Sequence, residues 1–561
     1  MMIANYMKRR SLLGALTLLT GVTFAQTAED GIRALDFDRY EYARNVFTNL
    51  TQTEPTKGAN YFYLGQSYLN LFKPDSALWA YNKGVQAEPN NFMNYVGLGE
   101  LMLEDNKNNE AEGYFDKALS FSKGRDGRSK DVNALRLVSQ AMISPEENRM
   151  IDAAHEHITR ALELDKNNYE AIITAGDVSL LKNPGQAGGA ADLYERAISL
   201  NPKNPKAYTR ISYIWLSVKN AEATNDALQR ALAVDANYAP ALKNLSEYYY
   251  QTRQFAKAKE TYVRYLENSE PSLGNKKRFA RILFRNKEYE EALNEINSIM
   301  QADQSDIFLY RLMGYSCYEV AEAKKDTTKY KPGLDAMETF LAKVNEKKVI
   351  ISDYEYIARL NAKISGNEAA VINAFNKAIS MEGSKIETIV EAAQVTSKLK
   401  KYQESSDFYS LYFSKITKND LPNLVRFGIV CMNSKQLVKA DSIFNRVIEI
   451  KPDYSESYFY KGNINSTFSE PDKAQLAKES YEKFILLVEA TPDKFKSKLI
   501  TAYAYLRYFY IQKEDKANIK LYNDKILVLD AENKEALDIK KALTAPPASK
   551  MVKKPAKGSK K

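Results

Sequence analysis

Residues 61–89 read YFYLGQSYLNLFKPDSALWAYNKGVQAEP, and the spacing of small and aromatic residues in this stretch recurs before and after it. A glycine, an alanine and an aromatic residue each return after 34 residues. The positions that share this interval are Gly31, Gly65 and Gly99, then Ala43, Ala77 and Ala111, then Phe47, Tyr81 and Phe115. Self-similarity at one fixed period is the sequence signature of repeat architectures. We therefore expect an array of similar units instead of three or four ordinary domains.

The composition favours helices for the repeated unit. Only 23 glycines and 17 prolines occur among the 561 residues, and 44% of the residues are hydrophobic. Glycine and proline are the poorest helix formers, so their low number and the abundance of Ala, Leu, Lys and Glu are typical of an all-α chain.

The second unit resembles the tetratricopeptide repeat (TPR), whose first helix carries an aromatic residue, Leu-Gly and Tyr, and whose second helix carries Ala and an aromatic residue before Pro. The residues that carry this resemblance are Tyr61, Leu64, Gly65, Tyr68, Ala77, Tyr81 and Pro89. The resemblance implies an all-α fold, an α-α superhelix with a concave groove. The register continues from about residue 25 to about residue 543 and predicts about fourteen helix-turn-helix repeats.

Small residues are expected to bring the two helices of each repeat together. We expect Gly65 on the first helix to face Ala77 on the second, with Tyr68 and Tyr81 filling the space beside them. Pro89 cannot continue a helix and is expected to end the repeat.

Two polar insertions divide the array. They lie at residues 123–131 and 320–333, and they predict three groups of repeats at residues 26–122, 132–319 and 334–532. A hinge and a longer loop are both consistent with each insertion, and the longer loop is favoured because insertions in solenoids usually leave the stack intact. We expect a polar capping helix at residues 533–544 and a disordered, Lys-rich tail at residues 545–561.

Residues 1–25 are typical of a secretory signal peptide. Lys8, Arg9 and Arg10 precede an apolar run at residues 12–24, and small residues precede Gln26. A permanent membrane helix needs about 20 apolar residues, so the run is too short to remain as an anchor. We expect cleavage before Gln26, export to the periplasm or cell envelope, and no integral membrane span in the mature protein.

The formal net charge of +9 is carried by the two ends of the chain. Three basic residues lie within residues 1–28 and six lysines within residues 545–561, with no acidic residue in either segment. The remaining body is neutral overall and gives no sign of the basic stripe that nucleic-acid binding needs. We expect no nucleic-acid partner.

The residue types that usually carry catalysis are scarce. The two histidines, His155 and His157, are two positions apart and point to different faces of a helix, whereas a metal pair needs a spacing of three or four. The two cysteines, Cys317 and Cys431, lie three repeats apart on expected inward positions, too far apart for a disulfide, and are interpreted as buried apolar thiols. We expect no enzymatic activity, no metal and no cofactor.

In the TPR family, ligands usually lie against first-helix residues that face the concave groove. In the seventh to tenth repeats the corresponding positions are basic or aromatic, and the candidate partner-binding residues are Lys243, Tyr250, Lys277, Arg281, Phe284, Arg285, Arg311, Tyr315, Tyr318, Arg359 and Lys363. Such residues suit a protein or peptide ligand with acidic groups. The alternative is a solvated helix face. Arg281 and Arg311 are the strongest candidates, and we expect both to lie apart from the repeat core.

Two functions are consistent with these features. The first is a protein-interaction scaffold or adaptor of the bacterial cell envelope, which binds partners in the groove. The second is a structural envelope protein that associates with the cell wall or outer membrane through its basic tail, residues 545–561.

Overall fold

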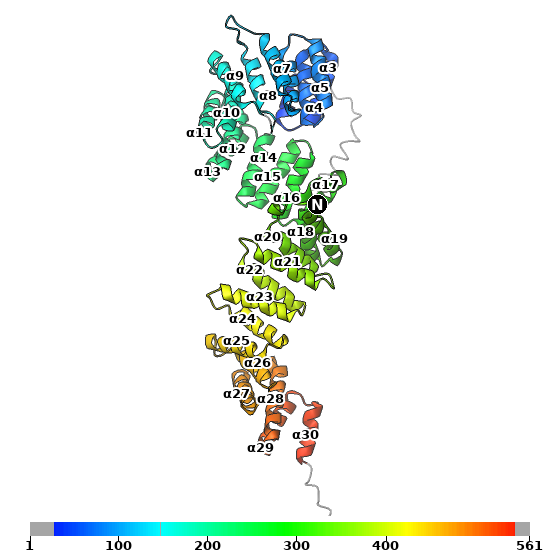
Figure 1. Ribbon diagram of the computed structural model, residues 1–561, viewed down its shortest axis with the longest axis vertical. Helices are drawn as coiled ribbons and strands as arrows, with labels where there is room; N and C mark the ends of the chain where they lie inside the picture. The colour runs from blue at the N-terminus through cyan, green and yellow to red at the C-terminus, as the bar shows by residue number, and fades with distance from the viewer. Residues whose placement is uncertain (1–26, 146, 148, 545–561) are drawn as a thin grey trace, which may run out of the picture. The chain divides into compact units, whose positions relative to one another are not determined.

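The computed structural model describes residues 27–145, 147 and 149–544, and Figure 1 shows their helices with their labels. The described residues form α-helices joined by turns and three short 3-10 helices, with one isolated β-bridge. The chain divides into two compact units between Ser305 and Asp306.

The helices of the first unit form eight antiparallel pairs, in which we call the first member helix A and the second helix B. Their bounds are α2 (Ala28–Asp36), α3 (Tyr40–Thr53), α4 (Gly58–Asn70), α5 (Pro74–Ala87), α6 (Phe92–Glu104), α7 (Asn108–Ser120), α8 (Val132–Ile143), α9 (Ile151–Leu164), α10 (Tyr169–Lys182), α11 (Gly188–Leu200), α12 (Pro205–Ser217), α13 (Ala221–Val234), α14 (Ala239–Gln251), α15 (Phe255–Asn268), α16 (Leu273–Arg285) and α17 (Tyr289–Ala302).

The second unit contains six further pairs and a final helix. Their bounds are α18 (Ile307–Lys324), α19 (Tyr330–Lys343), α20 (Ile351–Asn361), α21 (Glu368–Ser380), α22 (Ile386–Lys398), α23 (Tyr402–Lys415), α24 (Leu421–Asn433), α25 (Leu437–Ile450), α26 (Ser455–Asn465), α27 (Pro471–Val488), α28 (Lys496–Gln512), α29 (Lys516–Leu529) and α30 (Lys534–Thr544). The predicted all-α array of about fourteen helix-turn-helix repeats is confirmed, and α30 follows the last pair where a capping helix was expected.

The insertions adopt two different structures. Residues 123–131 form a turn between α7 and α8 that is closed by the bridge between Lys123 and Ser129. Residues 320–333 are mostly helical, because α18 continues to its end at Lys324, a 3-10 helix covers Thr327–Lys329, and α19 begins at Tyr330. The boundary between the two compact units falls at neither insertion.

The glycines of helix A lie against aromatic rings of helix B. A Cβ atom added to Gly65 would lie 2.2 Å from a ring carbon of Tyr81, and all three nearest atoms belong to that ring instead of to Ala77, the expected neighbour. Ala77 is fully buried beside Tyr81 in the same cluster. Gly65 therefore provides room for the Tyr81 ring, and Ala77 is packed in the same buried cluster.

The same contact recurs along the chain. The other helix-A glycines whose added Cβ would lie within 3.0 Å of the helix-B aromatic ring of their own pair are Gly31 against Phe47, Gly99 against Phe115, Gly176 against Tyr194, Gly428 against Phe444 and Gly462 against Tyr481. Gly97 of α6 makes the same close approach to Tyr81 of the preceding pair. In the ninth pair Met337 takes the place of the ring against Gly314.

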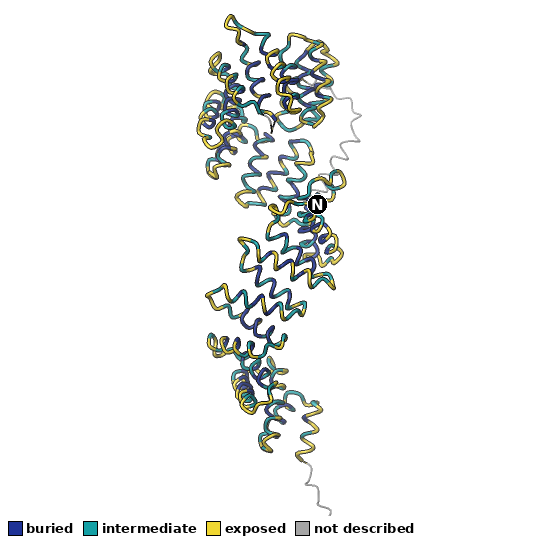
Figure 2. Tube along the Cα trace, in the orientation of Figure 1, coloured by how far each residue is buried: buried dark blue, intermediate teal, exposed yellow. Residues whose placement is uncertain are grey.

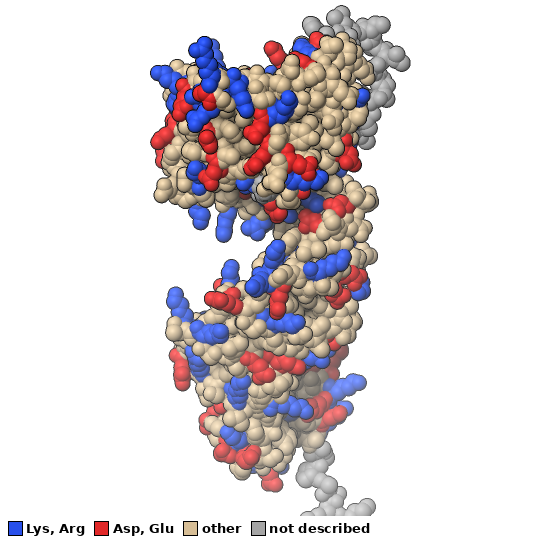
Figure 3. All heavy atoms as spheres, turned by 45° about the horizontal axis from the view of Figure 1, so that its top comes forward, with Lys and Arg blue, Asp and Glu red and all other residues tan. Residues whose placement is uncertain are grey.

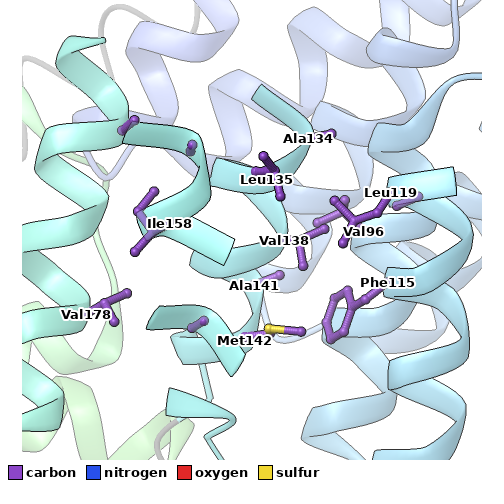
Figure 4. Close-up of a cluster of buried hydrophobic side chains, with 14 of the residues drawn as sticks. Val96, Phe115, Leu119, Ala134, Leu135, Val138, Ala141, Met142, Ile158 and Val178 are labelled. Atoms are coloured by element: carbon purple, nitrogen blue, oxygen red, sulfur yellow. The ribbon is translucent and has the colours of Figure 1, made fainter. Parts of the chain in front are cut away.

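The core continues from one pair to the next. In Figure 4, Phe115 of α7 lies close to Val138 and Met142 of α8, and Ile158 and Val178 extend the buried cluster to α9 and α10. Figure 2 shows buried residues inside the stack and exposed residues at the turns. Stacking of this kind buries apolar surface that one pair could not bury alone.

We predict that Gly65→Ala lowers the free energy of unfolding, because the new methyl group must displace the fully buried ring of Tyr81. Overpacking of this kind costs about 1–3 kcal/mol, more than the roughly 0.5–1 kcal/mol that alanine gains over glycine within a helix. Urea unfolding of the full chain measures the difference. Gly113→Ala on α7 is the control, since no atom lies within 4 Å of its added Cβ, and it should be neutral or stabilising. Equal stability of the two variants would contradict the prediction.

Candidate functional site

The predicted groove residues are divided between the two units and form two surfaces. The first, on α14 and α16, contains Lys243, Tyr250, Lys277, Arg281, Phe284 and Arg285. The second, on α18, α20 and the turn after α20, contains Arg311, Tyr315, Tyr318, Arg359 and Lys363.

Arg311 of the second surface binds a buried carboxylate. Its Nε and Nη2 each donate to Asp353 at 2.7 Å, and Nη2 also donates to the carbonyl oxygen of Lys348 at 2.7 Å. Asp353 is fully buried and accepts further hydrogen bonds from the Tyr315 hydroxyl at 2.6 Å and from the backbone N–H of Ile350 at 2.8 Å. Arg311 therefore connects the ninth and tenth pairs, and the expectation that it lies apart from the core is wrong.

Further polar bonds join one helix A to the next on this surface. Arg359 forms two bonds of 2.5 and 2.6 Å to Glu391 on α22, and Thr388 on α22 donates to Glu355 at 2.6 Å. Tyr356 on α20 donates to Glu319 on α18 at 2.5 Å. These bonds form a ladder across the ninth to eleventh pairs.

Aromatic rings lie within the ladder. The rings of Tyr315 and Tyr356 are stacked with centroids 3.9 Å apart, and Tyr318 meets Tyr356 edge-on at 5.7 Å. Lys363 binds Glu322 at 2.6 Å and lies 5.7 Å from the Tyr330 ring centroid. Burial, and next the carboxylate of Asp353, raises the pKa of Tyr315 far above its usual value, so this phenol stays a hydrogen-bond donor.

The first surface is also supplied with acidic partners from within the chain. Lys277 binds Asp303 at 3.1 Å. The guanidinium of Arg278 lies 4.0 Å from the ring centroid of Tyr250 and binds Glu247. Arg285 is exposed and lies 5.2 Å from the Phe255 ring, while Phe284 contacts Tyr289 edge-on. Arg281 lies on α16 with intermediate exposure.

Lys243 takes part in a long-range contact that sequence reasoning missed. Its Nζ lies 3.1 Å from the Asp38 carboxylate, which belongs to the turn between α2 and α3 in the first pair. The Tyr265 hydroxyl donates to the same carboxylate at 2.9 Å. We call the contact of the first pair with residues 235–270 the closing contact.

Three further interactions complete the closing contact. Phe37 meets the ring of Tyr238 edge-on at 5.5 Å. The Glu270 carboxylate accepts hydrogen bonds from the backbone N–H groups of Glu41 and Tyr42 on α3, at 2.6 and 2.8 Å. Arg33 and Asp235 form an ion pair of 3.0 Å. Repeat periodicity carries no signal for such a contact, because it predicts neighbours within the stack only.

A cavity of about 510 Å³ lies beside the closing contact, on the helix-A faces of α10, α12 and α14. Asp36 of α2 lines it opposite Lys206 and Arg210, and Arg210 lies 3.3 Å from Asp177. Asp36 itself is exposed, and Lys206 is paired with Glu170 at 2.9 Å. On the face seen in Figure 3, acidic and basic side chains are interspersed over the first unit.

A buried carboxyl group lies on the helix-A face of the third pair. Glu100 of α6 is 5% exposed and accepts from Gln66 Nε2 at 2.7 Å, and the same Gln66 nitrogen lies 3.0 Å from the Tyr81 hydroxyl. Burial raises the pKa of Glu100, and the hydrogen bonds from Ser144 and Gln66 only partly offset this effect.

Other predicted features are located as follows. His155 and His157 both lie on α9, and the described part of the chain contains no group of three or more His, Cys, Asp or Glu residues arranged for a metal ion. Cys317 and Cys431 are buried and free, on helix A of the ninth and twelfth pairs. Among the described helices none is long and apolar enough to cross a membrane. The predicted signal peptide, residues 1–25, and the Lys-rich tail, residues 545–561, lie outside the described residues.

Comparison with known proteins links the chain to TPR proteins, although no protein-family model matches it. A curated relative, a TPR repeat-containing protein of Methanocaldococcus jannaschii, is 22% identical over 246 residues, which are 41% of this chain and 41% of the relative. The match thus spans less than half the length of that relative.

Three solved structures of TPR proteins are also similar. The C-terminal part of a TPR repeat-containing protein from Cytophaga hutchinsonii is 28% identical and covers 47% of this chain and 98% of that one, with a TM-score of 0.38. YrrB, described as having an unusual peptide-binding site, is 19% identical. The match covers 35% of this chain and 95% of YrrB, with a TM-score of 0.22. TTC0263 of Thermus thermophilus is 14% identical. The match covers 40% of this chain and 99% of TTC0263, with a TM-score of 0.29.

We predict that Arg311→Ala destabilises the second unit by about 3–5 kcal/mol, since removing one partner of a buried ion pair leaves the other charge uncompensated. Thermal and urea unfolding followed by circular dichroism measures the effect. Lys331→Ala is the control, because Lys331 and Asp335 form an exposed pair within α19 of a kind worth only about 0.3–0.5 kcal/mol. An Arg311→Ala variant as stable as the control would show that Asp353 is not held by this arginine.

We predict that Glu100→Gln stabilises the protein at neutral pH. Because burial raises the pKa of Glu100 in the folded state, the folded protein binds more protons than the unfolded chain between the two pKa values, and stability falls as pH rises through that window. The glutamine variant lacks this loss, so its advantage in melting temperature should be larger at pH 7 than at pH 4. Glu112→Gln on the exposed face of α7 is the control. An advantage that did not change with pH would contradict the assignment.

Proposed function

Because the chain is a tetratricopeptide-repeat protein, we propose that it is a non-enzymatic scaffold that binds partner proteins or peptides on the helix-A faces of its repeats. The observation that carries the proposal is the arrangement of these faces. Charged and aromatic side chains lie there in ladders that pass from one pair to the next, as Arg359, Glu391 and Tyr356 do in the second unit.

The chemistry of these faces suits a partner with acidic groups. The basic side chains of Lys277, Arg359 and Lys363 already bind carboxylates of the chain, so a ligand carboxylate would share or replace a partner of the same kind. Charge-assisted bonds orient such a ligand, and the neighbouring aromatic rings offer contact area. Arg285 is exposed at the edge of the first surface, where it can meet a ligand directly.

We propose that the scaffold works in the bacterial cell envelope. The order of basic, apolar and small residues in residues 1–25 supports export. An adaptor that holds the parts of an envelope assembly together would need a long repeat surface and no chemistry of its own.

A second candidate is a structural envelope protein that associates with the cell wall or outer membrane through its tail. It is favoured by the six lysines and absent acids of residues 545–561. Attraction of lysines to an anionic surface falls off beyond about 8 Å at physiological ionic strength, so this association should be sensitive to salt.

We predict that affinity recovery of the mature chain, crosslinked in its native envelope, yields specific partners and that Arg281→Glu with Arg285→Glu reduces their recovery at least tenfold. Loss of one or two charge-assisted bonds, at about 1.5–3 kcal/mol each, accounts for that factor. Lys83→Glu with Lys203→Glu makes the same charge change at exposed positions on α5 and on the turn before α12 and should leave recovery unchanged.

Deletion of residues 545–561 separates the two candidates. Under the scaffold proposal, partner recovery persists after the deletion. If recovery instead depends on the tail and not on Arg281 and Arg285, the second candidate replaces the first.

A further inference from the structure

The closing contact is unusual for a repeat array. Repeats of a solenoid contact only their neighbours, and nearest-neighbour packing accounts for their stability. Here the first pair contacts residues of the sixth to eighth pairs, with Asp38 bonded to Lys243 and Tyr265 across more than 200 positions of sequence. The contact is therefore additional to the packing of neighbouring pairs.

The ion pairs of the closing contact are partly exposed. The side chains of Lys243 and Asp38 are 49% and 22% exposed, and those of Arg33 and Asp235 are 68% and 26% exposed. Ion pairs this accessible to water contribute little to stability, about 0–1 kcal/mol. These ion pairs therefore define the geometry of the closing contact more than its energy, while Phe37, packed against two buried clusters, and the Glu270 bonds to backbone N–H groups supply the rest of its stability.

The turn between α2 and α3 differs in charge from most of the equivalent turns, and only Glu514 in the last pair is also acidic among the other left-handed residues of the described chain. Asp38 occupies the left-handed position of this turn, with φ of 54°. The equivalent left-handed residue is basic in six other pairs, namely Lys219, Arg253, Lys287, Lys325, Lys400 and Lys435. The first pair thus presents an acidic turn to a surface that contains Lys243.

Residues 36–38 meet this surface together. Phe37 packs on Tyr238, Asp38 binds Lys243 and Tyr265, and Asp36 lines the cavity together with Lys206 and Arg210, within reach of their charges. The remaining cavity of about 510 Å³ continues from this point along α10 and α12. The surface therefore recognises an aromatic side chain between two carboxylates and has room for a ligand longer than the turn.

We propose that the surface formed by α12, α14 and α15 around Lys243 is a binding site for partner segments of the type acid-aromatic-acid, and that residues 36–38 of the chain compete for it. This inference rests on the proposed function as a scaffold. The chain's own turn acts as an internal ligand, so the site is available in proportion to the fraction of molecules in which the closing contact is open. Because the turn belongs to the same chain as the site, a partner must compete with it at every protein concentration.

Opening does not require α2 to unfold. Gly31 remains packed against Phe47, and Ala34 and Leu64 belong to the same core cluster of the first and second pairs. A small change in the angle between successive pairs would separate residues 36–38 from α14 while leaving each pair intact.

The test uses the full chain and a fluorescent peptide that copies residues 34–42, ALDFDRYEY. Asp38→Lys suits the turn, since lysine occupies the same left-handed position in five other pairs, and it reverses the charge that faces Lys243. We expect this variant to bind the peptide at least tenfold more tightly than the native chain, and to show faster hydrogen exchange in α2 and α3. Adding Lys243→Asp should restore slow exchange by re-forming the pair with reversed charges and should abolish peptide binding.

Matched controls isolate the acidic turn and the peptide charge. Asn106→Lys makes the corresponding change at the exposed turn of the third pair and should alter neither affinity nor exchange. A peptide with asparagine at both aspartate positions should bind at least tenfold more weakly. If Asp38→Lys lowers the helical content, Phe37→Ala provides a second comparison, because it removes the apolar packing of the turn on Tyr238 and its neighbours and leaves Asp38 in place.

Four results would overturn the inference. They are equal peptide affinity for the native and open variants, peptide binding that survives Lys243→Asp, equal binding of the asparagine peptide, and dimerisation of the open variant through residues 28–45 of a second copy. Failure to recover any envelope partner would count against the proposed function alone, since peptide binding and exchange are measured on the purified chain.

Discussion

The contact between a helix-B aromatic ring and a helix-A glycine sets the spacing on which the stack depends. Tyr81 approaches Gly65 so closely that no Cβ atom fits between them. A flat ring against bare backbone allows the two helices to approach closely and still bury a large side chain. Because the contact recurs from Gly31 to Gly462, neighbouring pairs present similar faces and can stack in series.

This packing leaves the helix-A faces to polar chemistry. The apolar residues of each pair are used against its neighbours, so the remaining face is built from charged and aromatic side chains. Arg311 and Asp353 show how such a face can also be structural, because a fully buried carboxylate needs all of its partners. Arg359 and Glu391 are more exposed and belong to the part of the ladder that a ligand can reach.

The closing contact adds a second level of organisation to the first unit. It joins the first pair to the sixth to eighth pairs through Asp38, Phe37 and Glu270. The stack of neighbouring pairs determines the fold, whereas the closing contact covers part of the helix-A face of the first unit.

The sequence by itself determined the helical repeat, its period and the number of pairs, because glycine, alanine and aromatic spacing report local packing between helices that are neighbours in the chain. It also placed candidate partner-binding residues such as Lys277 and Arg359 on helix A, where the structure has them. It did not identify Asp353 as the partner of Arg311, nor the ring of Tyr81 as the nearest neighbour of Gly65. Only the tertiary structure decided these pairings and the contact between Asp38 and Lys243. A periodic pattern specifies which face a residue occupies, whereas the partner of a charged side chain depends on the small rotations that accumulate from pair to pair and bring distant repeats together.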